Sequence, residues 1–245
     1  MEIRIGTSGW YYKHWKGPFY PLKIRDSEML PFYFKHFDTV EINNTFYSLP
    51  EKNTVKAWRR HTPDGFLFSV KGSRFITHMK KLSDPAESVK YFFDAVKPFG
   101  QKLGPIVFQL PPRWKCNIKR LEVFLNELPK ELKYSFEFRD KSWLCSEVYK
   151  LLAKHNAALC IYDFKGFESP LEITADFTYI RLHGPSKNAY QGCYDTNSLH
   201  KWAGRIKTWK GRLAAVYIYF DNDQMGYAAH NAMRLKEKLE QSNII

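Results

Sequence analysis

The chain is organised around short runs of β-branched and aromatic residues that are almost continuously apolar. Such runs are typical of parallel strands that are covered on both faces. They lie at residues 3–6, 39–43, 66–71, 105–110, 133–138, 157–162, 177–183 and 214–220. Eight parallel strands close a (β/α)₈ barrel, so we predict an α/β protein built as one barrel of the TIM type.

Most gaps between these runs carry the spacing of an amphipathic helix. After the third run, Asp84 can serve as the N-cap of a helix, and Pro85 suits the first helical position. The side chain of Glu87 can accept a hydrogen bond from the backbone N–H of Asp84, as in a capping box. An apolar stripe follows, and Gly100 then predicts a left-handed stop. The same spacing predicts helices around residues 121–128, 148–152, 199–209 and 226–241.

Two gaps fit this pattern less well. Residues 163–176 contain Gly166 and Pro170, so we expect an irregular crossover between the sixth and seventh strands. Pro31 also lies inside the first predicted helix.

No linker or internal repeat divides the chain, which predicts a single domain over residues 1–245. An open doubly wound sheet is the alternative fold, although no G-x-G-x-x-G motif follows the first run.

Polar side chains gather where the predicted strands end. Residues two apart on a strand share a face, and helices seal the outer face of a barrel. Four polar pairs have this separation: Glu41 and Asn43, Ser69 and Lys71, Glu137 and Arg139, and Arg181 and His183. Gln109, Asp163, Asp221 and Asn222 extend the set to other strands. Because TIM-barrel active sites form at the carboxyl ends of the strands, we expect a polar site there.

Two aromatic loops are candidates for the border of this site. The first places Trp10 among glycines and small hydroxyl residues, and the second contains Tyr190. Aromatic faces suit sugar rings and bases, and glycines let a ligand approach the backbone. Aromatic side chains that only pack over the barrel explain the first loop equally well, and that alternative stays open.

Composition limits the class of protein. With 44% hydrophobic and 26% charged residues, the chain can bury a sizeable core and is not disordered. The N-terminus lacks a basic segment followed by an apolar one, and no apolar run is long enough for a bilayer. We therefore expect a cytoplasmic protein without a membrane partner. The four cysteines form no C-x-x-C pair, which favours reduced structural thiols.

The basic surplus indicates an anionic partner. Lysine and arginine total 38 against 25 acidic residues, a formal net charge of +13 that attracts phosphates and nucleic acids. Many lysines fall on predicted helix surfaces, where solvation alone explains them. A small anionic ligand is the favoured partner, and a nucleic-acid partner stays open.

The polar groups favour an enzyme that hydrolyses or isomerises a small anionic or phosphorylated compound, with sugars included in that class. Lys71, Arg139 and Arg181 would hold the anion. Glu41 or Glu137 would act as general base or acid, with His183 as the second proton-transfer group. The other expected substrate-binding residues are Trp10, Asn43, Gln109, Tyr190 and Asn222.

Other interpretations of the same residues stay open. The three cations can instead neutralise the two glutamates in a buried network that ties strands together. A divalent metal would find donors in Glu41, Glu137, Asp163, His183 and Asp221, but the cations between them argue against it, so no cofactor is favoured. The alternative function is a nucleic-acid-binding protein or a metal-dependent repair-type endonuclease, and a non-catalytic scaffold is a third.

Several motifs together resemble one known family. They are G-T-S-G-W from Gly6, E-I-N-N-T-F-Y from Glu41, F-Q-L-P-P from Phe108, E-F-R from Glu137 and R-L-H-G from Arg181. The combination is similar to the YecE-like family, also called domain of unknown function 72. That resemblance implies a TIM-type barrel and a shared polar site, but no particular reaction. It carries over to Glu41, Asn43, Lys71, Gln109, Glu137, Arg139, Arg181 and His183.

Overall fold

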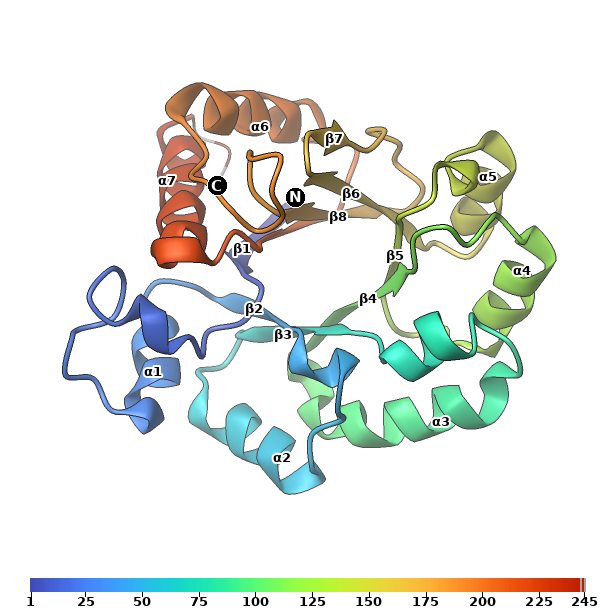
Figure 1. Cartoon of the computed structure of the whole chain (residues 1–245), viewed down its shortest axis with the longest axis horizontal. Helices are drawn as coiled ribbons and strands as arrows, with labels where there is room; N and C mark the ends of the chain where they lie inside the picture. Colours follow the sequence, from blue (N-terminus) through green and yellow to red (C-terminus); the bar gives the residue numbers. More distant parts are fainter. Residues whose placement is uncertain (243, 245) are drawn as a thin grey trace. The chain divides into compact units, whose positions relative to one another are not determined.

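Strands and helices alternate along the chain in the computed structural model, which describes residues 1–242 and 244 (Figure 1). The strands are β1 Glu2–Thr7, β2 Thr39–Ile42, β3 Leu67–Lys71, β4 Leu103–Leu110, β5 Tyr134–Phe138, β6 Ala158–Phe164, β7 Phe167–Glu168, β8 Phe177–Leu182 and β9 Ala215–Phe220. The α-helices are α1 Asp26–Tyr33, α2 Lys52–His61, α3 Pro85–Val96, α4 Ile118–Glu127, α5 Ser146–Lys154, α6 Thr196–Thr208 and α7 Tyr227–Gln241. None of the helices in this described part is long and apolar enough to cross a membrane.

The strand order is β1-β9-β8-β6-β5-β4-β3-β2. β1 pairs with β9, β9 with β8, and β3 through β6 pair in sequence, all in parallel. Parallel strands in this order, separated by helices, make an α/β fold of the (β/α)₈ type, so the predicted fold class is confirmed. The crossover after β6 holds only the short β7, which pairs antiparallel with β6, and the predicted irregularity is confirmed.

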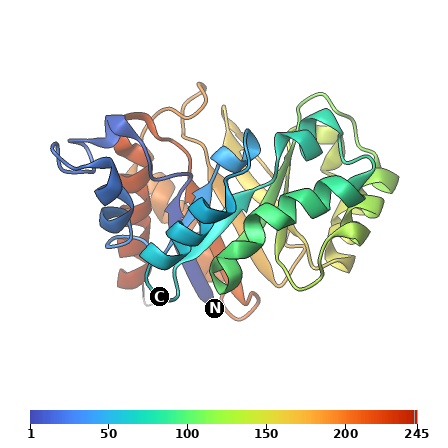
Figure 2. The same cartoon turned by 90° about the horizontal axis from the view of Figure 1, so that it is seen from below.

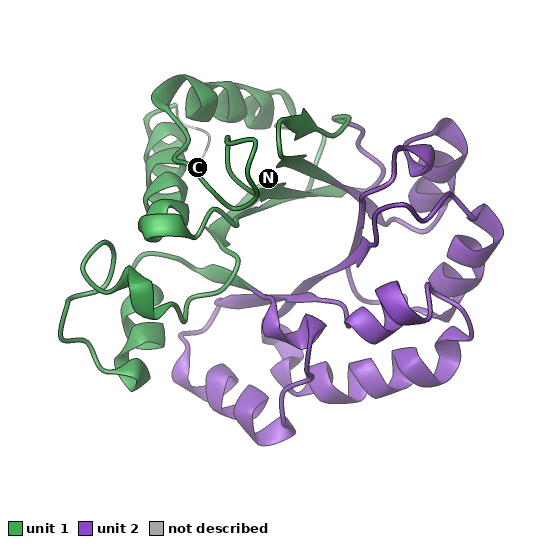
Figure 3. Ribbon diagram, viewed as in Figure 1, with its two compact units in different colours: residues 1–41, 161–171, 176–245 green, residues 42–160, 172–175 purple. Residues whose placement is uncertain are grey.

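The chain contains two compact units (Figure 3). Unit 1 comprises residues 1–41, 161–171 and 176–245, and unit 2 comprises residues 42–160 and 172–175. The prediction that residues 1–245 form a single domain stays a prediction.

In unit 1, the register of β1, β9 and β8 sorts the side chains onto two faces. Ile5, Ile218 and Ile180 are aligned, are buried, and lie on one face. The neighbouring aligned positions, Gly6, Tyr219 and Arg181, lie on the opposite face. Helix α7 packs against β1 and β9. Unit 1 therefore presents a face of tyrosines and charged residues opposite its aliphatic face.

In unit 2, aromatic packing fixes the helices against the strands. The ring of Phe108 in β4 lies 6.0 Å from that of Phe92 in α3 and 5.0 Å from that of Phe124 in α4. The residue after it, Gln109, points to the opposite face and pairs in register with Glu137 of β5. The helix-facing side is thus apolar, and the polar side chains lie on the other side.

One predicted helix start is wrong in its details. Pro85 begins α3 as expected, but Asp84 has a φ of 43° and makes no side-chain cap hydrogen bond. An N-cap normally has an extended backbone that aims its side chain at the first free N–H groups, and a left-handed residue does not. Gly100 has a positive φ of 56°, but α3 ends earlier, at Val96, and Gly100 lies within a 3₁₀ segment, Lys97–Lys102. Pro31 lies inside α1, as noted from the sequence.

Candidate functional site

The centre of the polar face in unit 1 is Arg181, which is fully buried in β8. Its Nε donates to Oε2 of Glu41 at 2.9 Å, and its Nη2 donates to Oε1 of Glu41 at 2.8 Å. The same Nη2 lies 3.1 Å from Oδ2 of Asp221, which directly follows β9. The fork of the guanidinium therefore holds two carboxylates that come from different strands.

Glu41 is itself fully buried and is surrounded by donors. Ser8 Oγ donates to Oε1 at 2.5 Å, and the hydroxyl of Tyr179 donates to Oε2 at 2.6 Å. Burial raises the pKa of Tyr179 well above its ordinary value, with Glu41 the next cause, so the phenol stays a donor. Because both oxygens of Glu41 are engaged, this carboxylate is better suited to holding Arg181 than to taking a proton from a substrate.

His183 ends the same chain of contacts. Its Nδ1 lies 2.9 Å from Oδ2 of Asp221, and the side chain is fully buried. A carboxylate at this distance accepts from an imidazole N–H, so this contact holds the ring in one orientation. Glu41, Arg181, Asp221 and His183 thus form one continuous series of hydrogen bonds.

A second carboxyl group supports the backbone of His183. Asp163 Oδ1 accepts from the His183 N–H at 3.0 Å, and both Asp163 oxygens accept from the hydroxyl of Tyr194 at 2.5 Å. Burial raises the pKa of Asp163 to about 6, although the hydrogen bond from Tyr194 opposes this rise. Asp163 therefore titrates closer to neutrality than an ordinary aspartate.

Aromatic side chains surround the imidazole. The ring centroids of Phe164 and Tyr190 lie 5.4 and 5.7 Å from that of His183. Asn222 contacts the loop that carries Tyr190, because its Nδ2 donates a hydrogen bond to Gly192 O at 2.8 Å. Tyr190 and Asn222 thus join the predicted group around His183. Trp10 is buried in the first loop, where its carbonyl accepts from the Tyr20 hydroxyl at 2.5 Å.

Unit 2 has a polar group of its own. Arg139 Nε donates to Oε1 of the fully buried Glu137, and Cys160 Sγ lies 4.0 Å from Oε2. Gln109 shares the face of Glu137, and its Oε1 is buried without a hydrogen-bond partner among the described residues. Lys71, at the end of β3, places its ammonium group 4.5 Å from the ring centre of Phe46.

The sequence-predicted residues therefore fall into two groups that the structure assembles within each unit. Glu41, Arg181, His183, Tyr190 and Asn222 meet in unit 1, and Glu137, Arg139 and Gln109 meet in unit 2. Lys71 lies on the same face of the unit 2 strands, because it aligns with Val107, two residues before Gln109. Asn43 is half-buried and precedes a short 3₁₀ turn at Asn44–Phe46.

Four residues of the unit 1 network were not among the predicted ones: Ser8, Tyr179, Tyr194 and Asn231. Parity gives a signal for Tyr179, which lies two residues before Arg181. The pairing of Ser8 with Glu41 is seen only in the structure. Tyr194 and Asn231 lie in a loop and in α7, and Asn231 Oδ1 accepts from the Tyr194 N–H at 3.0 Å. No strand spacing could have identified that pair.

Metal ligands do not cluster in these groups. Across residues 1–242 and 244, no set of three or more histidine, cysteine, aspartate or glutamate side chains is placed to hold one metal ion. Of the donors named from the sequence, Glu41 and Asp221 both bind Arg181.

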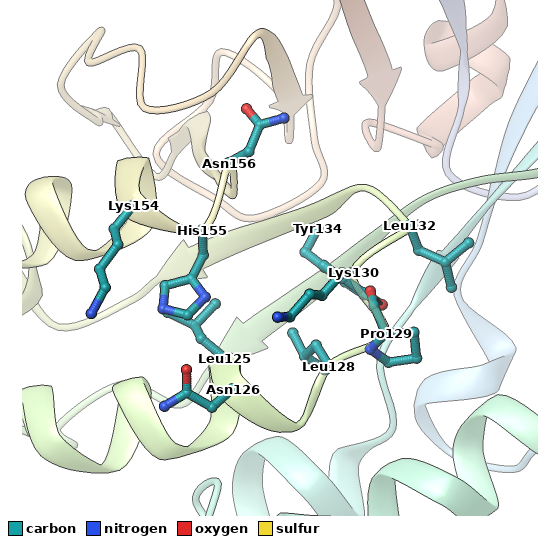
Figure 4. A pocket seen from close by; sticks show the side chains of 10 residues that line it. All are labelled: Leu125, Asn126, Leu128, Pro129, Lys130, Leu132, Tyr134, Lys154, His155 and Asn156. Atoms are coloured by element: carbon teal, nitrogen blue, oxygen red, sulfur yellow. Dashed lines mark hydrogen bonds between the residues drawn. The ribbon is translucent and has the colours of Figure 1, made fainter.

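A separate hollow in unit 2 lies where β5 and β6 begin (Figure 4). It is lined by Leu125, Asn126, Leu128, Pro129, Lys130, Leu132, Tyr134, Lys154, His155 and Asn156. Burial lowers the pKa of His155, whose Nε2 is buried without a hydrogen-bond partner in the described structure. None of the predicted site residues lines this hollow, which lies at the amino ends of the strands.

Comparison with known proteins identifies relatives along the whole chain. The UPF0759 protein YunF of Bacillus subtilis (strain 168) is 26% identical over 271 residues, covering 97% of this chain and 95% of YunF. The UPF0759 protein YecE of Escherichia coli (strain K12) is 33% identical over 138 residues, covering 56% of this chain and 48% of YecE.

Solved structures agree with this relationship. A DUF72 family protein from Thermotoga maritima MSB8 has a TM-score of 0.89 and 28% identity, covering 98% of this chain and 100% of its own. A DUF72 family protein from Enterococcus faecalis V583 shares the fold with a TM-score of 0.84 at 19% identity, covering 97% of this chain and 95% of its own. The family model described as "Protein of unknown function DUF72" matches residues 4–244. The resemblance seen in the sequence motifs is thus confirmed, and the chain belongs to the DUF72 family.

Proposed function

We propose that this protein is an enzyme that acts on a small anionic compound, such as a phosphorylated sugar, with His183 as its proton-transfer group. The observation that carries the proposal is the 2.9 Å contact between His183 Nδ1 and Asp221. A carboxylate bound to one ring nitrogen orients the imidazole and stabilises the positive charge that forms when the other nitrogen takes a proton. Hydrolysis and isomerisation both use such a group.

The partners of Asp221 extend this proposal. Arg181 binds Asp221 and Glu41 together, so these three side chains have their geometry fixed before any substrate arrives. In the proposal, Glu41 and Arg181 position Asp221, in place of the base and anion-binding roles expected from the sequence. The buried position of all three supports this role, because a guanidinium shared by two carboxylates has little charge left for an external anion.

The groups of unit 2 that suit an anion are Lys71 and Arg139, with Gln109 on the same face. We propose that these three residues form an anion-binding group of unit 2. Glu137 lies within this group, bound to Arg139, and in the proposal it stays a candidate general acid or base. An ammonium, a guanidinium and an amide together match the donors that phosphate and carboxylate ligands require.

Incubation with a panel of sugar phosphates tests the proposal, with phosphate release and isomer formation followed by NMR. The His183→Gln variant keeps a side chain of similar size but removes the proton-transfer group. His200→Gln is the matched control, because His200 is exposed on α6. We expect turnover by wild type and H200Q and a loss of about 100-fold or more in H183Q. Turnover that is unchanged in H183Q contradicts the role of His183, and no turnover of any panel member contradicts the substrate class.

A second candidate function, binding of nucleic acid, is favoured by one surface. Helix α2, which lies beside α3 (Figure 2), has basic residues and no acidic ones. A shallow hollow on it is lined by Asn53, Lys56, Arg59 and Arg60. Like charges one turn apart destabilise a helix, and these three cations form no ion pair with the described residues. A phosphate backbone would balance them.

Fluorescence anisotropy of a labelled single-stranded oligonucleotide tests this surface. Lys56→Glu/Arg60→Glu changes the charge of α2, and Lys119→Glu/Lys130→Glu makes the same change elsewhere in unit 2. We expect the affinity to fall with rising salt, and to fall at least 10-fold more in the α2 variant than in the control. The absence of binding at low salt, or equal weakening in both variants, excludes this function for α2.

A further inference from the structure

Two cysteines of unit 2 lie on segments that run side by side. Cys116 follows β4 and precedes α4, and Cys145 directly precedes α5. Three contacts join the segments. The indole N–H of Trp143 donates to Trp114 O at 2.7 Å, the N–H of Cys116 donates to Ser142 Oγ at 2.9 Å, and the two indole rings lie 5.0 Å apart. Both cysteines therefore lie at the same junction of two loops.

The two thiols also influence each other directly. The pKa of the Cys116 thiol is raised to about 11, first by burial and then by the nearby Cys145. This influence agrees with the three contacts that bring the two segments together. Both side chains are partly exposed, so a small reagent in solution can reach them.

We propose that Cys116 and Cys145 are a redox-active pair that closes into a reversible disulfide. The other cysteines lack this arrangement. Cys160 is buried against Glu137, and Cys193 lies in unit 1. This inference does not depend on the proposed enzymatic reaction.

The oxidant would be the disulfide of a small thiol, such as oxidised glutathione. The thiolate of Cys145 attacks one sulfur of that disulfide, forms a mixed disulfide, and releases the first small thiol. Cys116 then loses its proton and attacks the Cys145 sulfur, which forms the internal disulfide and releases the second small thiol. The two protein thiols are oxidised, the small disulfide is reduced to two thiols, and the two protons pass to the released thiolates. Cys145 attacks first in this scheme because the raised pKa of Cys116 keeps that thiol protonated.

The disulfide would connect the loops that leave the carboxyl ends of β4 and β5. Gln109 lies on β4, and Glu137 and Arg139 lie at the end of β5, so the bond would restrain the chain next to three candidate residues. It would also close a loop that contains α4 and β5, which limits the conformations of the unfolded chain. Oxidation should therefore stabilise the protein as well as fix this edge of unit 2.

The experiment equilibrates the full-length protein in buffers with increasing ratios of oxidised to reduced glutathione. Free thiols are then trapped by alkylation, and the linked peptides are identified by mass spectrometry. We expect a link between Cys116 and Cys145 with the loss of two hydrogen atoms, reversed by a reducing agent, and unchanged in Cys193→Ser. In Cys116→Ser, we expect the reaction to stop at the mixed disulfide between Cys145 and glutathione. The oxidised wild type should melt several degrees above the reduced form, and neither Cys116→Ser nor Cys145→Ser should show that shift.

Three results would overturn the proposal. Both cysteines could remain open to alkylation at every glutathione ratio, which would show that the thiols cannot reach bonding geometry. Cys116 or Cys145 could link to Cys160 or Cys193 instead. Glutathione could also persist on Cys145 in the wild type, which would show that Cys116 does not resolve the mixed disulfide.

Discussion

Removing the guanidinium of Arg181 is the most direct test of the network in unit 1. The Arg181→Met variant keeps much of the side-chain volume but removes every hydrogen bond from Arg181 to Glu41 and Asp221. Both carboxylates then lose the cation that neutralises them, and Glu41 is fully buried. Breaking a buried ion pair at one partner costs about 3–5 kcal/mol, so we expect the free energy of unfolding to fall by that amount.

The Glu41 side of the pair should be less sensitive. In Glu41→Gln, Arg181 keeps Asp221 as a counter-charge, and the amide oxygen can still accept a hydrogen bond. We expect a loss of about 1–3 kcal/mol, the range for a hydrogen bond to a charged group. In Glu41→Gln/Arg181→Met, no buried glutamate charge is left without a partner. The free energy of unfolding of the double variant should therefore fall by at least about 1 kcal/mol less than the sum of the two single losses.

Urea unfolding followed by circular dichroism at neutral pH measures these values. The exposed pair of Arg25 and Glu28 provides the control, because Arg25→Ala removes an ion pair of similar length, 2.7 Å, from the surface. That control should cost less than about 1 kcal/mol. Strictly additive losses, or a loss in R181M as small as in the control, would refute the conclusion that the buried network stabilises unit 1.

Two further predictions concern the surroundings of His183. Because the folded protein holds the pKa of Asp163 at about 6, above its ordinary 3.8, it binds more protons than the unfolded chain between these values. The free energy of unfolding should therefore fall as the pH rises through this window. Urea titrations at several pH values should show a weaker dependence of this free energy on pH in Asp163→Asn. An unchanged dependence would show that another group causes it. Gly184 has a φ of 106°, and an added Cβ would lie 2.3 Å from the carbonyl oxygen of Gln191. Gly184→Ala should thus lower the melting temperature by several degrees, whereas Gly204→Ala, in open space on α6, should not lower it; equal effects would contradict the steric argument.

The strands could be predicted from the sequence because their signal is local and strong. Each strand that is covered on both faces is an apolar run in the sequence. The first residues of β4 and β9 lie within two residues of the predicted positions, and their last residues are the predicted ones. The cap of α3 shows where local signals fail. Lys81, Leu82 and Asp84 all have positive φ values, so the path of the chain before α3 excludes the backbone that a capping aspartate needs.

The candidate site could be predicted only as far as strand parity extends. Parity predicted that Arg181 and His183 share a face, and the register places Arg181 beside Tyr219 and Gly6 on that face. It could not predict which carboxylate each cation binds. The partners of Arg181 come from β2 and from the end of β9, and only their positions in space bring them together. The charge balance of the sequence was informative about neutralisation but not about pairing.

The cost of burying charge supports the proposed role of the network in unit 1 beyond the joining of strands. Apolar side chains of the same volume often stabilise a core as well as a buried ion pair does, so stability alone does not explain Glu41 and Arg181. Ser8 and Tyr179 already complete the hydrogen bonding of Glu41, and the pair could end there. Instead, Arg181 also binds Asp221, and Asp221 binds His183. One cation between two carboxylates leaves one negative charge beside the imidazole, which would stabilise the ring when it takes a proton. A network that served only to connect strands would need no such group at its end.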